Sequence, residues 1–481
     1  MKDMISFVQD GKIKTLSFNE VFTPTTTVLN YLRQSPCHKG VKEGCAEGDC
    51  GACTIVLGEI DSSNRMHYRA VDSCLVFMPM LQGKQLITVE NLSFLNSRNE
   101  QILHPVQEAM VSCNGSQCGY CTPGIVMSLF ALYKSGVTSS RKNAEDALTG
   151  NLCRCTGYQP ILEAALLSCS KPKKDLISDD EEDIIALLQR IRALGKSVSI
   201  HTGNQDYDQP LNKAEALALR KQYPSAILIS GATDVGLRVT KKHERLSPVL
   251  DISHVEELKH LEETETDVFI GAGLDLETLR IFSETRLPAL FEALTVFGSR
   301  QIRTLATLGG NLGSASPIGD TLPVLMAYNA DIQLESTEGK RLVNMNRFIL
   351  GYRQTDLRSG ELITGIRISK PGPDTHLRFY KVSKRKDLDI STVSACFHLE
   401  LEHNKVKNIV LAYGGMAAVT KRAEEAETFL KGKSWNRREV EKAMALVEKA
   451  YTPLSDARSG AAFRSLAAKN LLLKFWTDTT T

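Results

Sequence analysis

The chain has 481 residues, of which 42% are hydrophobic and 24% are charged, and its formal net charge at pH 7 is only +2. That length exceeds one ordinary core and predicts about three or four domains. The small net charge excludes a broad field that would hold nucleic acid or an anionic membrane. Because no run of about 18 apolar residues occurs and the polar start lacks a signal-peptide core, we expect a cytoplasmic protein.

Cysteine is unevenly distributed. Of the twelve cysteines, eleven precede residue 170 and only Cys396 lies downstream. A disulfide framework is not expected in a reducing compartment. The clustering therefore predicts metal sites confined to the N-terminal third of the chain.

The first segment predicts a small α+β domain, residues 1–90. Residues 2–20 alternate around Asp10-Gly11, as in a two-stranded hairpin. A capped short helix is expected at 28–34, then a glycine-rich cysteine loop from Gly44 to Cys53. Strands are expected at 54–61 and 66–75.

Helical periodicity follows, and then a mixed pattern. We expect helices at 104–113, 122–134 and 159–169 within a helical domain, residues 91–170. The charged run that begins at Lys171 predicts a linker, residues 171–205. Strands and helices then alternate in a domain of residues 206–373. A strand meander and a helical tail from Asn436 make up a C-terminal α+β domain, residues 374–481.

The first cysteine set has the spacing C-x4-C-x2-C with a fourth cysteine downstream, as in plant-type ferredoxins. Three thiolates on one loop can converge on two irons, and the loop glycines let backbone N–H groups face the sulfurs. The alternatives are a structural zinc site or coincidence, although zinc sites usually pair two short C-x2-4-C elements. The predicted ligands are Cys45, Cys50, Cys53 and Cys74.

A second set combines a C-x2-C pair with a later C-x-C pair. Spacing alone leaves zinc and a 2Fe–2S cluster equally open. A ferredoxin-like domain directly upstream favours the cluster, because electrons need closely spaced stations. The predicted ligands are Cys118, Cys121, Cys153 and Cys155, whereas Cys37, Cys113, Cys169 and Cys396 fit neither set.

Three runs, GCAEGDCGACTIVL, NGSQCGYCTPGIVMSLFAL and LTGNLCRCTGYQPILEA, resemble the iron–sulfur region of the xanthine oxidase/dehydrogenase family. The resemblance implies a β-grasp ferredoxin domain and a four-helix domain, each with one 2Fe–2S cluster, and all eight cysteines match ligand positions. Gln117 and Cys155 match positions that approach the molybdopterin of the catalytic domain. Asn114 departs from the histidine that is frequent in relatives.

Two glycine-containing stretches, 228–235 and 307–311, could cradle a pyrophosphate with backbone N–H groups, but neither is a Rossmann G-x-G-x-x-G motif. Taken alone, ordinary turns explain them better. Both resemble the FAD-binding domain of the same family, although Ala232 replaces the usual Gly or Asn, and Phe297 would lie against the isoalloxazine. The implied flavin-binding residues are Leu228, Ile229, Ser230, Gly231, Ala232, Thr233, Asp234, Val235, Phe297, Thr307, Leu308, Gly309, Gly310, Asn311, Asp320, Ile363 and Lys381.

A charge run at 384–386 is expected to be a solvated face.

The likeness implies a function as well as a fold. It indicates the small chain of a bacterial-type split enzyme, without the molybdenum domain, in a dimer of heterodimers with a large molybdopterin-binding subunit. Electrons from xanthine or hypoxanthine hydroxylation, which yields urate, would cross both clusters to FAD and then to NAD. No residue of this chain is expected to catalyse the hydroxylation.

Three alternatives stay open at this stage. The chain could serve another molybdenum hydroxylase that oxidises aldehydes, nicotinate or carbon monoxide. It could be a free-standing electron carrier without a molybdenum partner. It could also be a zinc-stabilised binding module. The sequence decides neither the substrate nor whether NAD or oxygen is the final acceptor.

Overall fold

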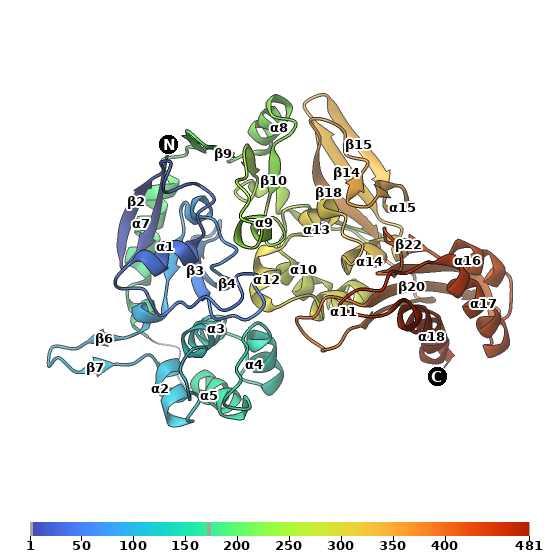
Figure 1. The fold of residues 1–481 in the computed structure, drawn as a ribbon, viewed down its shortest axis with the longest axis horizontal. Coiled ribbons are helices and arrows are strands. Elements are labelled where there is room, and N and C mark those ends of the chain that lie inside the picture. The colour runs from blue at the N-terminus through green and yellow to red at the C-terminus, as the bar shows by residue number, and fades with distance from the viewer. Residues whose placement is uncertain (1–2, 171–174, 481) are drawn as a thin grey trace. The chain divides into compact units, whose positions relative to one another are not determined.

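The computed structural model describes residues 3–170 and 175–480 (Figure 1). The chain forms two compact units, and both are discontinuous in sequence. The first comprises Met1–Leu211, Ser225–His254 and Ser299–Leu305, and the second comprises Asn212–Pro224, Val255–Gly298 and Ala306–Thr481.

A β-grasp domain begins the first unit, as expected. Its five-stranded sheet has the order β2-β1-β5-β3-β4, with β1 antiparallel to β2 and parallel to β5. The side chain of Thr27 caps the helix α1 by accepting a hydrogen bond from the Asn30 N–H at 3.2 Å. The predicted hairpin, helix and strand pair are confirmed. The elements are β1 (Met4–Gln9), β2 (Lys12–Ser17), α1 (Val28–Gln34), β3 (Thr54–Ile60), β4 (Met66–Asp72) and β5 (Gln85–Ile87).

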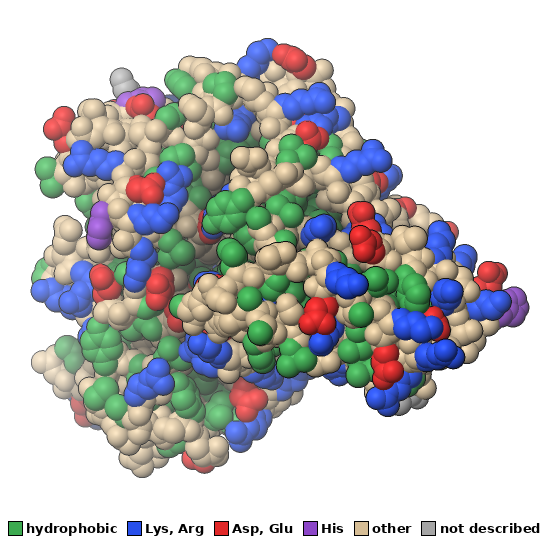
Figure 2. All heavy atoms as spheres, turned by 45° about the vertical axis from the view of Figure 1, so that its right-hand side comes forward, with side chains coloured by type: hydrophobic (Ala, Val, Ile, Leu, Met, Phe, Trp, Pro, Cys, Tyr) green, Lys and Arg blue, Asp and Glu red, His purple; other side chains and the backbone are tan. Residues whose placement is uncertain are grey.

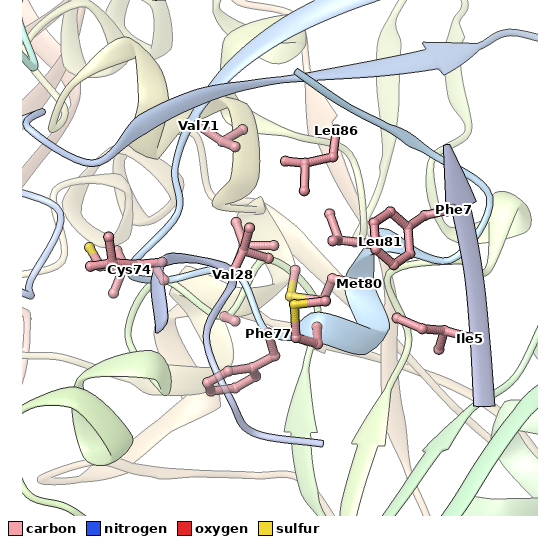
Figure 3. Packing of buried hydrophobic residues seen from close by; sticks show 14 of the residues in the cluster. Ile5, Phe7, Val28, Val71, Cys74, Phe77, Met80, Leu81 and Leu86 are labelled. Atoms are coloured by element: carbon pink, nitrogen blue, oxygen red, sulfur yellow. The ribbon is translucent and has the colours of Figure 1, made fainter. Parts of the chain in front are cut away.

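The core of this domain contains two of the predicted ligand cysteines. Cys53 and Cys74 are 2% and 1% exposed and belong to the cluster that includes Ile5, Phe7 and Leu81. Figure 3 shows Cys74 at one margin of the cluster, away from Ile5 and Phe7. The two thiols are therefore held by the packing of the sheet domain as well as by their loop.

Four helices form the second domain of this unit, and the three helices predicted there are confirmed. The helix α3 is buried along almost its whole length, from Gly124 to Tyr133, which fits its apolar composition. A short hairpin projects from this region (Figure 1). The elements are β6 (Phe94–Leu95), β7 (Gln101–Ile102), α2 (Pro105–Ser112), α3 (Thr122–Lys134), α4 (Arg141–Leu148) and α5 (Gln159–Cys169).

The segment predicted as a linker holds regular structure in its described part, while residues 171–174 lie outside the described residues. Ile184, Leu188 and Ile191 repeat at helical spacing in α7 and pack with Val8 and Ile60 of the β-grasp domain. A small sheet of order β10-β11-β9-β8 follows. The elements are α6 (Leu176–Asp179), α7 (Glu181–Arg192), β8 (Val198–Thr202), β9 (Gln205–Gln209), β10 (Ile227–Ile229), α9 (Gly236–Thr240), β11 (Val249–Asp251) and α12 (Arg300–Leu305).

The second unit contains an antiparallel sheet of order β12-β13-β18-β14-β15. Strands and helices alternate here, as the sequence predicts for residues 206–373. The elements are α8 (Lys213–Gln222), β12 (Leu261–Glu263), β13 (Asp267–Gly271), α10 (Leu276–Ser283), α11 (Pro288–Thr295), α13 (Leu308–Ser314), α14 (Thr321–Ala327), β14 (Asp331–Ser336), β15 (Gly339–Asn344), α15 (Met345–Phe348), β16 (Ile349–Gly351), β17 (Gln354–Thr355) and β18 (Leu362–Ser369).

A four-stranded meander and three helices end the second unit, which confirms the predicted meander and helical tail. Phe397, Tyr413 and Phe475 form the aromatic centre of their common core. No helix among the described residues is both long and apolar enough to cross a bilayer. The elements are β19 (Thr375–Val382), β20 (Val393–Glu402), β21 (Lys405–Gly414), β22 (Lys421–Arg422), α16 (Glu424–Leu430), α17 (Arg437–Ala450) and α18 (Ala461–Thr480).

We predict that Gly124→Ala destabilises the first unit, although helix propensity alone would favour alanine by about 1 kcal/mol. A Cβ at this position would overlap the Gly51 carbonyl oxygen, which is backbone and cannot turn aside. The expected net loss is about 1–3 kcal/mol, seen as a lower calorimetric unfolding midpoint. Gly460→Ala is the control, since a Cβ there meets no atom within 4 Å. A raised midpoint in Gly124→Ala would contradict the packing argument.

Candidate functional site

The four thiols of the first set lie as two adjacent pairs. Cys45 and Cys50, on the loop between α1 and β3, hydrogen bond through their side chains. The Cys53 Sγ lies 3.4 Å from the Cys74 Sγ. The structure thus pairs the predicted ligands first with second and third with fourth.

Backbone N–H groups stabilise negative charge on this loop. The amides of Glu47 and Asp49 donate to the Cys45 Sγ at 3.4 and 3.3 Å. The hydrogen bond from the Cys50 thiol, together with these amides, lowers the pKa of Cys45 to about 5 despite burial. Gly48 and Gly51 take φ values of +75° and +68°, which glycine adopts without strain, so the loop can turn its amides inward.

Asp72 is a neighbour that sequence reasoning missed. It is fully buried at the end of β4, and its Oδ1 lies 3.6 Å from the Cys53 Sγ. Burial, and then the negative charge of Cys45, raise the pKa of Asp72 to about 8. Its Oδ2 has no hydrogen-bond partner within the described part of the chain. An aspartate at a strand end carries no sequence signal for such a position.

The second set also forms two pairs, but here the first cysteine pairs with the fourth and the second with the third. The Cys118 Sγ lies 3.6 Å from the Cys155 Sγ, and Cys121 hydrogen bonds to Cys153. Cys121 is the N-cap of α3, while Cys153 and Cys155 lie on the loop between α4 and α5. The Cys153 N–H donates to the Tyr158 hydroxyl at 2.8 Å, which fixes the loop against the start of α5.

One sulfur in each pair of the second set has a lowered pKa. The Tyr120 N–H, and then the Cys155 thiol, lower the pKa of Cys118. Burial opposes ionisation of Cys153, but the Thr156 hydroxyl and nearby amides still lower its pKa. Burial raises the pKa of Cys121 to about 12. The lowered pKa values of Cys118 and Cys153 suit metal ligation, because the thiolate is the ligand.

The paired arrangement bears on which metal group the two sets fit. A mononuclear zinc site would draw four sulfurs around one point, each about 2.3 Å from the metal. Pairs of sulfurs are what two irons require when four cysteines bind one 2Fe–2S cluster. The donor sets therefore fit that group.

All twelve cysteines are free thiols. Cys396 is buried in β20, and Cys113 and Cys169 pack against the helical core. Cys37 is exposed. None of these four lies in either paired set.

Of the predicted flavin-binding residues, Leu228 to Val235 belong to the first unit. Leu228 and Ile229 end the strand β10, and the turn after it leads into α9. Ala232 takes φ +57°, a left-handed conformation that costs an alanine about 1 kcal/mol and that Gly or Asn adopts readily. Backbone geometry thus agrees with the Gly or Asn that the family resemblance implies at this position.

The remaining predicted flavin-binding residues belong to the second unit. Residues 307–311 begin a helix rather than forming a turn, and the Thr307 Oγ1 accepts a hydrogen bond from the Gly310 N–H at 3.0 Å. The Asn311 Oδ1 accepts from the Thr321 hydroxyl at 2.6 Å. A Cβ on Gly313 would lie 3.7 Å from the Ile363 side chain, so α13 runs close to β18.

A buried ion pair joins two of these predicted residues, Lys381 and Asp320. The Lys381 Nζ donates to the Asp320 Oδ2 and to the Val296 carbonyl, both at 2.9 Å, next to Phe297. The Ser391 hydroxyl donates to the other oxygen of Asp320 at 2.5 Å. The side chains of Lys381 and Asp320 are only 6% and 7% exposed. Sequence reasoning found neither Val296 nor Ser391.

The charge run at 384–386 is exposed, and Figure 2 shows basic and acidic side chains interspersed over the face in view. Arg385 pairs with Asp389 at 3.0 Å. This agrees with a solvated surface.

Comparisons with known proteins match these regions to three family models. Residues 88–166 match a 2Fe-2S binding domain, residues 201–371 match the FAD binding domain in molybdopterin dehydrogenase, and residues 378–479 match the CO dehydrogenase flavoprotein C-terminal domain. The xanthine dehydrogenase of Drosophila pseudoobscura pseudoobscura is 33% identical over 87% of this chain, and that of Emericella nidulans is 31% identical over 99%. The chain belongs to the xanthine dehydrogenase family. It spans 35% and 38% of the length of these two relatives.

Solved structures support the fold assignment. Carbon monoxide dehydrogenase from Hydrogenophaga pseudoflava aligns with a TM-score of 0.54 and 26% identity, covering 56% of this chain and 95% of that one. Reconstituted CO dehydrogenase from Oligotropha carboxidovorans aligns with a TM-score of 0.53 and 28% identity, covering 56% and 96%. The fold class is confirmed as multidomain α+β, with 2Fe–2S and FAD-binding domains of this family's type.

We predict that Lys381→Met destabilises the second unit by about 3–5 kcal/mol, because it leaves the buried Asp320 carboxylate without its cation. Calorimetric unfolding should show a lower midpoint for that unit. Asp320→Asn in the same chain should recover much of the loss, since the two effects share one interaction. Lys386→Met, which removes an exposed lysine, is the matched control and should change the midpoint little. Equal unfolding midpoints in Lys381→Met and Lys386→Met would contradict the importance of the ion pair.

Proposed function

We propose that this chain is the electron-transfer part of a xanthine dehydrogenase, passing electrons from a molybdopterin-binding subunit through two 2Fe–2S clusters to FAD and then to NAD. When bound, the clusters accept single electrons, and FAD accepts pairs and can release a hydride. The observation that carries the proposal is the presence of two sets of paired thiols, each with backbone amides that donate to one of its sulfurs, in a chain that matches an FAD-binding family model.

The solvent exposure of the cysteines supports an order in which the two sets receive electrons. Cys118 and Cys155 of the second set are exposed, as is the neighbouring Gln117. Cys53 and Cys74 of the first set are buried. An exposed set can receive electrons from another protein surface, so we place electron entry there. Gln117 and Cys155 would then face the molybdopterin.

The proposed partner is a large molybdopterin-binding subunit, with two copies of each chain in the complex. Similar CO dehydrogenase chains are matched over 95–96% of their length by 56% of this chain. A portion of about this size is therefore a chain of its own in those enzymes, which supports a divided enzyme here.

The proposed reaction is hydroxylation of xanthine or hypoxanthine to urate, with NAD as the acceptor. Support comes from the relatives, which are named xanthine dehydrogenases. Asp234, exposed on the turn after β10, is proposed to lie beside the flavin ring where nicotinamide docks. We assign no residue of this chain to the purine chemistry, which the proposal places on the partner.

Affinity purification of the tagged chain from native extract tests the whole proposal. We expect a large molybdenum-containing chain to copurify, with about four irons and one FAD per copy of this chain. The complex should form urate from xanthine while reducing NAD. Zinc in place of iron, or about two irons in fully loaded protein, would refute the cluster assignment. Recovery of the bare chain, fully active with NADH and a dye, would favour a free-standing carrier.

We predict that Cys45→Ser abolishes the electron paramagnetic resonance signal of the first cluster and halves the iron content, because a hydroxyl replaces the thiolate with the lowered pKa. The second cluster's signal and flavin absorbance should remain. Cys37→Ser is the matched control, since it removes an exposed thiol outside both sets. Persistence of both cluster signals in Cys45→Ser would refute the ligand assignment.

A further inference from the structure

Three glycines mark a very close approach between the two cysteine-bearing loops of the first unit. A Cβ on Gly51 would overlap the Gly150 carbonyl, and a Cβ on Gly124 would overlap the Gly51 carbonyl. A Cβ on Gly150 would overlap the Gln301 side chain. Gly51 lies between Cys50 and Cys53, and Gly150 lies three residues before Cys153. The loops that carry the two thiol sets are therefore in direct backbone contact.

Asn151 joins these loops with its side chain. It is 3% exposed, and its Nδ2 donates to the Gly51 carbonyl at 3.2 Å and to the Thr54 Oγ1 at 3.4 Å. Asn151 itself belongs to the loop of the second set. One amide group thus spans from the second cysteine loop to the first.

Two further buried side chains hold that amide in place. The hydroxyl of Ser128, on α3, donates to the Asn151 Oδ1 at 2.7 Å. The Gln301 Nε2 donates to the same oxygen and to the Ser128 Oγ, both at 3.0 Å. Ser128 and Gln301 are 2% and 0% exposed. Because both groups donate to Oδ1, they orient the Nδ2 of Asn151 toward Gly51.

A backbone hydrogen bond lies beside this amide. The Leu152 N–H donates to the Cys50 carbonyl at 3.0 Å. Leu152 precedes Cys153 directly, so the bond connects the main chain at one predicted ligand with the main chain next to another. The hydrogen bonds between these two loops therefore determine the distance between the two thiol sets.

We propose that Asn151 is a positioning residue that fixes the distance and orientation between the two iron–sulfur clusters, with Ser128 and Gln301 as its supports. The inference rests on the proposed function of the eight cysteines as cluster ligands. Asn151 acts through the backbone, by donating a hydrogen bond to the Gly51 carbonyl. Supporting hydrogen bonds of this kind hold functional groups to within about 0.5 Å, and electron transfer falls steeply with distance.

Asn151→Asp tests the proposal in the loaded protein. The variant keeps an oxygen that can accept from Ser128 and Gln301, but it replaces the donor to Gly51 with a second acceptor. When both clusters are reduced, their unpaired spins interact, and the resulting splitting of the resonance lines falls with the cube of their separation. We expect four irons and normal flavin absorbance, with the splitting lost or clearly reduced.

Asn143→Asp is the matched control. This asparagine lies on α4 of the same domain, and its Nδ2 donates to the Thr138 carbonyl in an exposed position. The resonance splitting in Asn143→Asp should equal that in the unaltered protein. Unchanged splitting in Asn151→Asp with four irons present would overturn the positioning proposal and leave the proposed function intact. Loss of iron from Asn151→Asp would also overturn it, because the residue would then support a cluster site itself.

Two milder variants keep the test decisive if Asn151→Asp does not fold. Ser128→Ala and Gln301→Leu each remove one support but leave the hydrogen bond from Asn151 to Gly51 available. Both should reduce the splitting by less than Asn151→Asp. Splitting equal to that of the unaltered protein in both would overturn the proposal. Fewer than four irons in the unaltered protein would instead refute the proposed function.

Discussion

Holding several thiolates close together inside a protein is costly, because burial penalises charge and like charges repel. The loops around the two cysteine sets offset this cost in two ways. Backbone amides face the sulfurs of Cys45 and Cys118, and within each pair of the second set one sulfur holds the charge more readily than its neighbour. Strand packing around Cys53 and Cys74 supplies the rigidity that the loops alone would lack.

The same loops must also stay close to each other, and small residues make that possible. Gly51, Gly124 and Gly150 remove the side chains that would separate the backbones. The fully buried guanidinium of Arg303 adds an ion pair with Asp146 of α4, with 2.8 Å between nitrogen and oxygen. Buried polar groups with satisfied partners favour a single arrangement of these elements, since any slip would leave donors or acceptors unpaired.

Much of the local structure followed from sequence patterns, because those patterns are themselves local. Alternation around Asp10-Gly11 predicted a hairpin, and the cysteine spacings selected eight thiols that the structure brings together in pairs. The helix α7 was hidden because charged residues outnumber its three core-facing apolar ones. The stretch that begins at Thr307 was expected to be a turn, since its glycines masked a capped helix.

Roles that depend on contacts between distant residues were beyond sequence reasoning. Gln301 and Asn151 are 150 positions apart and lie in segments with unrelated patterns. The raised pKa of Asp72 comes from burial and from the charge of Cys45, which is distant from it in sequence. The family resemblance implies flavin-binding positions, but the ion pair between Lys381 and Asp320 forms only in the tertiary fold, since the two residues are 61 positions apart.

The discontinuous make-up of the first unit has a consequence for biosynthesis. A ribosome releases the chain N-terminus first, so early segments can begin folding before later ones exist. Ser299–Leu305 belongs to this unit, yet the ribosome releases it only after Asn212–Pro224 and Val255–Gly298 of the second unit. Until then, Ser128 and Asn151 lack their partner Gln301, and Asp146 lacks Arg303. A nascent chain therefore passes through an interval in which both cysteine loops exist but Asn151 still lacks its hydrogen bond from Gln301.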